Sequence, residues 1–335
     1  MRSRPAQQMV LTALLPLLML IFCASARAQQ RPVHTYSIVA RDTATGALGV
    51  AVQSHWFSVG SLVTWAEAGV GAVATQSFVD PSYGPLGLAL MRAGKTAPQA
   101  LEALLVADPG REVRQVAMID AHGGVAAHTG SRCIEGAGHI VGRNYSVQAN
   151  LMRDSTVWGA MAAAYETSEG DLAERMLTAL EAGEAAGGDI RGSQSAAILI
   201  VSETSSGRPW LDRLMELRIE DHPDPVAELR RLIGLHRAYE HMNRGDLAVE
   251  HDDIEGALQQ YSAAESMIPD NLEMRFWHAV ALVNAGRIEE SLPIFRHVFQ
   301  ADPSWAVLIP RLPASGTLIA DETILATILS VAPAR

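Results

Sequence analysis

The apolar periodicity of this 335-residue chain changes at the segment His222-Pro223-Asp224-Pro225. Upstream of it, short apolar runs of the kind found in β-strands recur, with helical patterns between them. These runs span residues 36–40, 48–52, 70–75, 115–119, 124–128 and 196–201. Downstream, helix-forming residues dominate from Val226 to Phe299, and no strand-like run remains. The sequence therefore predicts an α+β chain with two domains, a number that its length also suggests.

Within the upstream part, helices and one hairpin can be placed from local signals. Thr96 is positioned to cap a helix over 97–107, and Pro109-Gly110 follows the end of that helix. The turn sequence at 121–124 predicts a β-hairpin over 113–129. Two further helices are expected over 155–167 and 171–186. Strands and helices in this order favour sheets that are covered by helices on their outer faces.

The downstream part contains an internal repeat with an offset of 34 residues. Its four positions, small-aromatic-small-proline, are Ala257, Tyr261, Ala264 and Pro269, which recur as Ser291, Phe295, Val298 and Pro303. This order resembles the second helix of tetratricopeptide repeats. The match covers about two repeats over residues 223–303, too few for an independent solenoid. We therefore expect the repeats to pack against the upstream domain or against the tail 304–335. A capping helix is expected in this tail near 321–331.

The first 28 residues have the features of a secretory signal peptide. Arg2 and Arg4 precede an apolar stretch over 9–22, and Ala26-Arg27-Ala28 fits the small-x-small cleavage rule. Cleavage there predicts a mature chain that begins at Gln29 and is periplasmic or secreted. A retained membrane anchor and a lipoprotein attached through Cys23 are the alternatives.

Cleavage also changes the charge and the cysteine content. It removes three arginines and no acid, so the formal net charge goes from −11 to −14. Such an acidic chain argues against nucleic acid and against anionic membrane surfaces as partners. Cys133 is then the one remaining cysteine, so no intramolecular disulfide can form.

Thr35 stands at the head of the first expected strand, where a nucleophile that uses its own α-amine as base would lie. An α-amine titrates near pH ~8, so part of it is neutral at physiological pH and can accept the hydroxyl proton. In the chain as translated, His34 acylates this amine. The mechanism therefore needs a further cut before Thr35. The alternatives are that Thr35 is an ordinary strand residue, or that Ser37, two residues on, is the nucleophile.

Several long stretches of the upstream domain resemble the bacterial DUF1028 family, which is grouped with the N-terminal nucleophile (Ntn) hydrolases. The matching stretches are 36–42, 66–76, 81–85, 107–111 and 187–197. The resemblance covers about half of the chain and implies a four-layer αββα sandwich over residues 29–222. It also places Thr35 where leaderless relatives have the residue after the initiator methionine. This chain departs from them, because Gln29 to His34 would still precede Thr35.

The resemblance and the positions of polar residues suggest a site around Thr35. Asp42, at the end of the first strand, would orient the basic group, or it caps the turn that follows. His55 lies where relatives are expected to carry lysine, or it is an ordinary rim histidine. The candidates for substrate binding are Glu67, Tyr83 in a loop over a pocket, Asn150 at a strand end, Asp189, Arg191 and Ser193. Arg191 would bind a substrate carboxylate, or it would pair with Asp189 as a structural clamp.

No cofactor or metal is expected. His122, His128 and His139 lack the spacing of metal ligands, and no phosphate-binding or dinucleotide-binding fingerprint is present. Three functions remain open. The chain could be an exported hydrolase of small amides or peptide-like substrates. It could be a non-catalytic scaffold that binds a protein partner through 226–303. The same helices could instead form a homodimer.

Overall fold

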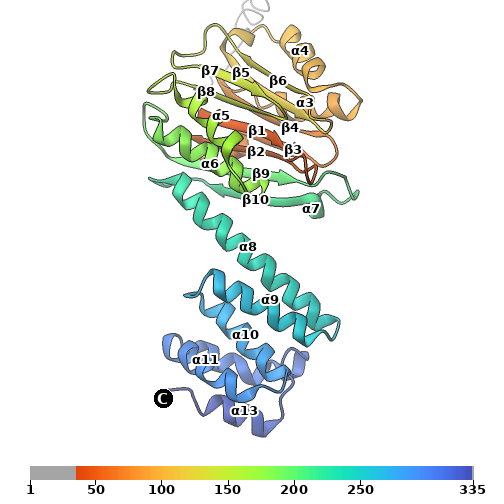
Figure 1. Cartoon of the computed structure of the whole chain (residues 1–335), viewed down its shortest axis with the longest axis vertical. Helices are drawn as coiled ribbons and strands as arrows, with labels where there is room; N and C mark the ends of the chain where they lie inside the picture. The colour runs from red at the N-terminus through yellow and green to blue at the C-terminus, as the bar shows by residue number, and fades with distance from the viewer. Residues whose placement is uncertain (1–34, 334–335) are drawn as a thin grey trace, which may run out of the picture.

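The computed structural model describes residues 35–333. The expected signal peptide, 1–28, and His34 lie outside this range. Figure 1 shows two β-sheets with their helices at one end of the molecule and a group of helices at the other end. The long helix α8 (Pro225–Glu250) runs from the first group to the second. The chain is thus a mixed α/β structure with antiparallel sheets in its N-terminal part and a helical C-terminal region.

Six antiparallel strands form the larger sheet, in the order β10-β9-β2-β1-β8-β7. Their bounds are β1 (Thr35–Arg41), β2 (Leu48–Ser54), β7 (Gly138–Gly142), β8 (Tyr145–Asn150), β9 (Ser195–Val201) and β10 (Arg213–Ile219). Four antiparallel strands form the smaller sheet, in the order β3-β4-β5-β6. They are β3 (Thr64–Glu67), β4 (Gly71–Ser77), β5 (Arg114–Asp120) and β6 (Val125–Thr129).

The two sheets pack face to face through an apolar cluster. Val39, Val50 and Val52 of the larger sheet contribute to it, as do Ala74 and Ile119 of the smaller one. Successive residues of a strand point to opposite faces. In β1 the residues on either side of Val39 therefore face away from this interface and enter a second cluster. Both faces of the central strands are buried, which explains their nearly continuous apolar runs.

Helices cover the outer face of each sheet. α5 (Val157–Thr167) and α6 (Leu172–Ala185) pack on the larger sheet. α3 (Tyr83–Arg92) and α4 (Ala97–Ala107) pack on the smaller one. The Thr96 hydroxyl caps α4 and Gln99 completes the capping box, so this helix has the bounds expected from the sequence. The short elements are α2 (Gly60–Val63), α7 (Pro209–Asp212) and the 3₁₀ turn η1 (Arg111–Val113).

One expectation about a segment of this layer is wrong. The sequence 82–84 was expected to form a loop over a pocket. Instead, Tyr83 is the first residue of α3, and its side chain is buried between this helix and the smaller sheet.

Helix α8 belongs to both parts of the molecule. Val226, Leu229 and Ile233, in its first half, are buried in the cluster beneath α6 and the larger sheet. Ala238 and Met242, in its second half, are buried among the C-terminal helices. The expected border at 222 thus marks the change from strand to helix, but the core of the N-terminal part extends beyond it.

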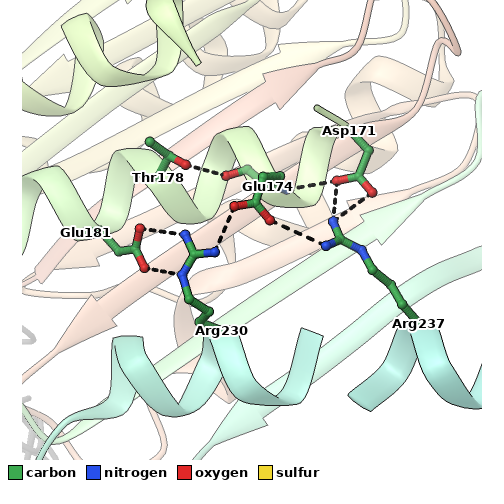
Figure 2. A network of polar contacts seen from close by, with 6 residues as sticks. All are labelled: Asp171, Glu174, Thr178, Glu181, Arg230 and Arg237. Atoms are coloured by element: carbon green, nitrogen blue, oxygen red, sulfur yellow. Dashed lines mark hydrogen bonds and ion pairs between the residues drawn. The ribbon is translucent and has the colours of Figure 1, made fainter. Parts of the chain in front are cut away.

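Ion pairs attach α8 to α6 along its exposed flank (Figure 2). Arg230 contacts Glu181 and Glu174, with a closest distance of 2.5 Å to Glu181 Oε1. Arg237 contacts Asp171 at 2.8 Å and Glu174 at 3.4 Å. Glu174 thus bridges the two arginines, which are two turns apart on α8.

Helices after α8 fold back on one another around two apolar clusters. They are α9 (Ile254–Met267), α10 (Leu272–Asn284), α11 (Ile288–Ala301), α12 (Ser304–Leu308) and α13 (Glu322–Leu329), with the 3₁₀ turns η2 (Ile309–Arg311) and η3 (Pro313–Ser315). α13 lies where a helix was expected near 321–331. Over residues 35–333, no helix combines the length and the apolar character needed to cross a bilayer.

Candidate active site

Polar strand ends from both sheets meet at one end of the N-terminal part. In the larger sheet, Thr35 at the start of β1 lies opposite Ser54 at the end of β2 and Asn150 at the end of β8. In the smaller sheet, Gln76 near the end of β4 lies opposite Gln115 near the start of β5. Because the pairs are antiparallel, strand starts and strand ends alternate along this edge, and the face-to-face packing brings the two edges together.

Thr35 is fully buried at this edge, and side chains hold both its hydroxyl and its carbonyl. Its Oγ1 donates to Oγ of Ser54 at 3.1 Å. Its carbonyl oxygen accepts from Nε2 of Gln76 at 3.2 Å and from Nδ2 of Asn150 at 3.4 Å. The backbone of Thr35 is therefore fixed from both sheets.

Gln115 connects the two amides that hold Thr35. Its Oε1 accepts from Nε2 of Gln76 at 2.7 Å and from Nδ2 of Asn150 at 2.9 Å. Its Nε2 donates to Thr129 Oγ1 at 2.9 Å and also to the carbonyl oxygens of Gly138 and Ala149. We refer to Gln76, Gln115 and Asn150 as the amide cluster. All three are buried, so each hydrogen bond satisfies a polar group that water cannot reach.

Ser37 is held by the same kind of partner. Its Oγ donates to Oε1 of Gln76 at 2.6 Å and accepts from Nε2 of Gln148 at 2.6 Å. Carboxamides do not take up a proton near neutral pH, so these contacts position the Ser37 hydroxyl without activating it. The alternative that Ser37 is the nucleophile gains no support from this geometry.

Backbone strain accompanies two of the strand ends. Ser77, after Gln76, has φ 71°, and Leu151, after Asn150, has φ 58°. Left-handed conformations are uncommon for residues other than glycine and concentrate at functional sites. Here the chain turns sharply just beyond the two amides that donate to the Thr35 carbonyl.

The loop before β9 brings Asp189 and Arg191 beside this edge, close to His55, which follows β2. Asp189 is 3% exposed and accepts from the Arg191 backbone N–H and guanidinium, at 2.6 Å from Nη2, and from the His55 N–H at 3.3 Å. This geometry matches the clamp alternative for Arg191. The N–H of Gln194 donates to the carbonyl of Ser54 at 3.1 Å and ties the loop to the strand opposite Thr35.

Ser193 of the same loop faces the helix layer. Its Oγ donates to Glu184 Oε1 at 2.7 Å, and the other carboxylate oxygen of Glu184 accepts from the hydroxyl of Tyr36. Burial, and then the Glu184 carboxylate, raise the pKa of Tyr36 well above its ordinary value. The Tyr36 hydroxyl therefore stays protonated and remains a donor.

Three sequence-predicted residues lie away from Thr35. Asp42 lies beyond the opposite end of β1, roughly 23 Å along the strand, where it accepts from Ala44 N at 2.9 Å and Thr45 Oγ1 at 2.8 Å. This placement matches the turn-capping alternative and does not fit a role beside the nucleophile. Glu67 pairs with Arg92 at the β3–β4 turn, the far end of the smaller sheet.

Tyr83 lies in the outer helix layer, and its hydroxyl donates to Asp108 Oδ2 at 3.1 Å. Burial, and then the Asp108 carboxylate, raise the pKa of Tyr83. Tyr83 therefore connects α3 to the segment after α4, and this position does not bring it to Thr35.

Sequence reasoning missed most of the amide cluster. It singled out Asn150, but Gln76 and Gln115 lie in two other strands, β4 and β5, far from Asn150 in the sequence. A signal was present, because Gln76 and Gln115 each lie beside the apolar run of a buried strand. Buried carboxamides in such positions need partners, and here they are partners for one another. Among residues 35–333, no group of three or more His, Cys, Asp or Glu side chains is arranged to hold a metal ion.

Comparison with known proteins places this architecture in a family. No curated protein matches the chain. Its structure is similar to the crystal structure of protein SPO2555 from Silicibacter pomeroyi, described as a DUF1028 protein. The two are 32% identical with a TM-score of 0.54, and the match covers 60% of this chain and 84% of that one. The model of the family of unknown function DUF1028 matches residues 35–229, more than half of the chain. The chain therefore belongs to the DUF1028 family.

Proposed function

We propose that this protein is an exported amide hydrolase of the Ntn type, with Thr35 as nucleophile after the bond between His34 and Thr35 has been cut. The observation that carries the proposal is the position of Thr35. It opens β1, and side chains from two sheets hold its carbonyl and hydroxyl. Two sheets packed face to face with helices outside them support the further assignment to the four-layer αββα sandwich of Ntn hydrolases.

The proposed reaction uses groups of one residue. The neutral α-amine of Thr35 accepts the proton of Oγ1, and Oγ1 forms a bond to the carbonyl carbon of the substrate amide. The tetrahedral intermediate collapses with breakage of the C–N bond, and the leaving amine takes the proton from the α-ammonium group. Water then attacks the ester carbonyl carbon, the bond between Oγ1 and this carbon breaks, Oγ1 takes a proton, and the carboxylic acid product leaves. The amide cluster supports this chemistry, because a fixed Thr35 carbonyl limits rotation of the residue that carries both nucleophile and base.

We propose small amides or peptide-like molecules as substrates. The loop that carries Asp189, Arg191 and Ser193, together with His55 and Asn150, would form the wall that contacts them. In this proposal Asp189 fixes the direction of the Arg191 guanidinium, as a clamp does. No cofactor or metal has a part in the mechanism.

The test begins with the mature protein purified from its exporting host. Intact mass and N-terminal sequencing should give a chain that starts at Thr35. A β-lactone probe should then acylate this protein, while Thr35→Ala abolishes labelling and Thr35→Ser retains it. Thr43→Ala, an exposed threonine beyond the other end of β1, is the matched control and should label as the unaltered protein does. A mature chain that begins only at Gln29 would contradict the mechanism, because the amine of Thr35 would still be acylated.

A second proposal concerns the C-terminal helices. The 34-residue repeat is reflected in burial, since the aromatic and small positions of α9 and α11 that correspond are all buried. This supports tetratricopeptide-like repeats that bind a protein partner or a second copy through 226–303. Deleting that whole span would not be a clean test, because Leu229 and Ile233 belong to the core of the N-terminal part. Surface variants in the helical region should abolish partner binding or dimerisation and leave Thr35 labelling intact.

A further inference from the structure

A groove of about 740 Å³ opens between α8, α10 and the segment Ser315–Thr317. Its volume falls within the range of ordinary ligand sites. Asn284 of α10 fixes the rim, because its side chain donates to the Thr317 carbonyl at 3.0 Å and accepts from Ile319 N at 2.8 Å. α8 also packs closely against Tyr261 of the lining, since a Cβ on Gly245 of α8 would lie 2.5 Å from the Tyr261 ring.

The groove is acidic. Asp246, Glu250 and Glu273 line it, and none of its described lining residues is a lysine, arginine or histidine. Two of these acids lie in the last five residues of α8. The C-terminus of a helix carries partial negative charge and favours cations, so carboxylates there cost stability. This arrangement is explained if the groove has a cationic occupant.

Aromatic side chains accompany the carboxylates. The hydroxyl of Tyr239 donates to Glu273 Oε2 at 2.6 Å, and that of Tyr261 donates to Asp246 Oδ1 at 2.7 Å. The hydrogen bond to Glu273 raises the pKa of Tyr239, so this hydroxyl keeps its proton. Trp277, partly buried, lies in the same wall. Each tyrosine thus holds a carboxylate in place beside an aromatic ring.

We propose that this groove binds an extended cationic peptide segment, with lysine or arginine side chains set against Glu250, Asp246 and Glu273. Carboxylates attract the cationic group directly, and the faces of Trp and Tyr rings add cation–π attraction. The volume of the groove, about 740 Å³, suits several residues rather than a single ammonium ion. The proposal rests on the second proposed function, partner binding by the C-terminal helices, and not on Thr35, so the site would operate with or without catalysis at the other end of the molecule.

Calorimetric titration of the mature protein with two capped peptides tests the proposal. We expect acetyl-Ala-Arg-Ala-Arg-Ala-amide to bind with a Kd below about 1 mM, and the peptide with glutamate in place of arginine not to bind. Glu250→Gln should weaken binding about threefold to tenfold, which is the effect of one partly exposed charge pair. Glu289→Gln removes the same charge from an exposed site on α11 outside the groove and should leave the Kd within about 1.5-fold.

Thermal unfolding separates this effect from damage to the fold. The Glu250 side chain makes no hydrogen bond or ion pair within residues 35–333, and Glu250 is the last residue of α8. Its neutralisation should therefore leave the melting temperature unchanged or raise it, while peptide binding falls. The proposal is overturned if the arginine peptide does not bind at 1 mM, if both peptides bind equally, or if Glu289→Gln weakens binding as much as Glu250→Gln does.

Discussion

The side chain of Gln115 joins the two sheets. It starts on β5, contacts Thr129 on the neighbouring strand of its own sheet, and reaches the carbonyls of Gly138 and Ala149 on the other sheet. Its remaining oxygen holds the two amides that fix Thr35. A single buried glutamine therefore couples the packing of the sheets to the geometry of the candidate nucleophile.

Replacing Gln115 by leucine removes the acceptor of two buried amides and the donor of two buried carbonyls. Unpaired buried polar groups cost about 1–3 kcal/mol each, with partial relaxation. We expect Gln115→Leu to lower the free energy of unfolding by about 2–4 kcal/mol in urea titrations. Gln259→Leu, at an exposed site on α9, should change it by less than ~0.5 kcal/mol. Equal effects of the two variants would show that the cluster adds no stability.

His139, which contacts Thr129 in the same region, makes the stability of the protein depend on pH. Its Nδ1 lies 2.8 Å from Thr129 Oγ1, and burial, followed by the nearby His128, lowers the pKa of His139. The unfolded chain, with an ordinary pKa near ~6.5, then binds the proton first as pH falls. The contribution of His139 to stability is therefore present above about pH 6.5 and is lost as the pH drops through the lower folded pKa.

We expect the free energy of unfolding to fall more between pH 7.5 and 5 in the unaltered protein than in His139→Gln. Urea titrations at several pH values measure this slope. His297→Gln, on the exposed side of α11, should keep the unaltered slope. The assignment fails if His139→Gln has the same pH profile as the unaltered protein.

At the scale of elements, the helices whose ends are set by neighbouring residues could be predicted from the sequence. α4 begins at a capping box and was placed correctly, because the hydroxyl and amide that form it are three residues apart. The segment 82–84 at the start of α3 was expected to be a loop because it follows Asp80-Pro81 and ends in glycine. In the structure a Cβ on Gly84 would lie 2.3 Å from the Trp65 ring, and one on Gly87 would lie 2.8 Å from Met118 Cε. The close packing of α3 against the sheet therefore favours glycine at position 84, where the sequence suggested a loop.

In the candidate site, too, residues marked by local sequence could be predicted, whereas contacts that depend on the packing of the sheets could not. Thr35 and Asn150 could be identified because each stands at a recognisable strand end. The expected place of Asp42 beside Thr35 ignored strand length, since a seven-residue strand separates its two ends by roughly 20 Å. The partners Gln76 and Gln115 depend on the pairing of strands and on how the sheets face each other, which no local pattern encodes.

The contact between α6 and α8 is electrostatic on its exposed flank. Arg230 reaches Glu181 and Glu174 on the other helix, whereas Arg231 pairs with Glu228 of its own helix. We expect Arg230→Gln to cost about 1 kcal/mol of unfolding free energy at low salt and markedly less in 1 M NaCl. Arg231→Gln should cost less than ~0.5 kcal/mol. A cost for Arg230→Gln that is independent of salt would contradict an electrostatic role.

At the scale of the whole molecule, one helix, α8, belongs to the cores of both the N-terminal part and the C-terminal helices. Its 26 residues extend over about 39 Å, and each half is buried in a different apolar cluster. Because the helix is continuous between these clusters, we expect the two groups of elements that it joins in Figure 1 to keep one relative orientation. The Thr35 edge and the acidic groove would then stay at a constant separation.

Gly234 offers a test of this rigidity, because a Cβ there would meet no atom within 4 Å. Gly234→Ala should stabilise the protein by about 0.5–1 kcal/mol and preserve its small-angle X-ray scattering profile. Gly234→Pro should interrupt the helix at a cost of about 3 kcal/mol and broaden the distribution of interatomic distances. Identical scattering profiles for the two variants would refute a rigid connection through α8.

The shared helix also bears on how such a chain could be assembled by recombination. A genetic junction at the proline-rich segment 222–225 would lie where the strand pattern of the sequence gives way to helix, but it would separate Leu229 and Ile233 from the apolar cluster in which they are buried. The unit that keeps this core intact is therefore the N-terminal part together with the first half of α8. Natural or engineered exchanges of the C-terminal helices should succeed when the crossover lies after Ile233, inside the helix, and when the incoming segment continues its register.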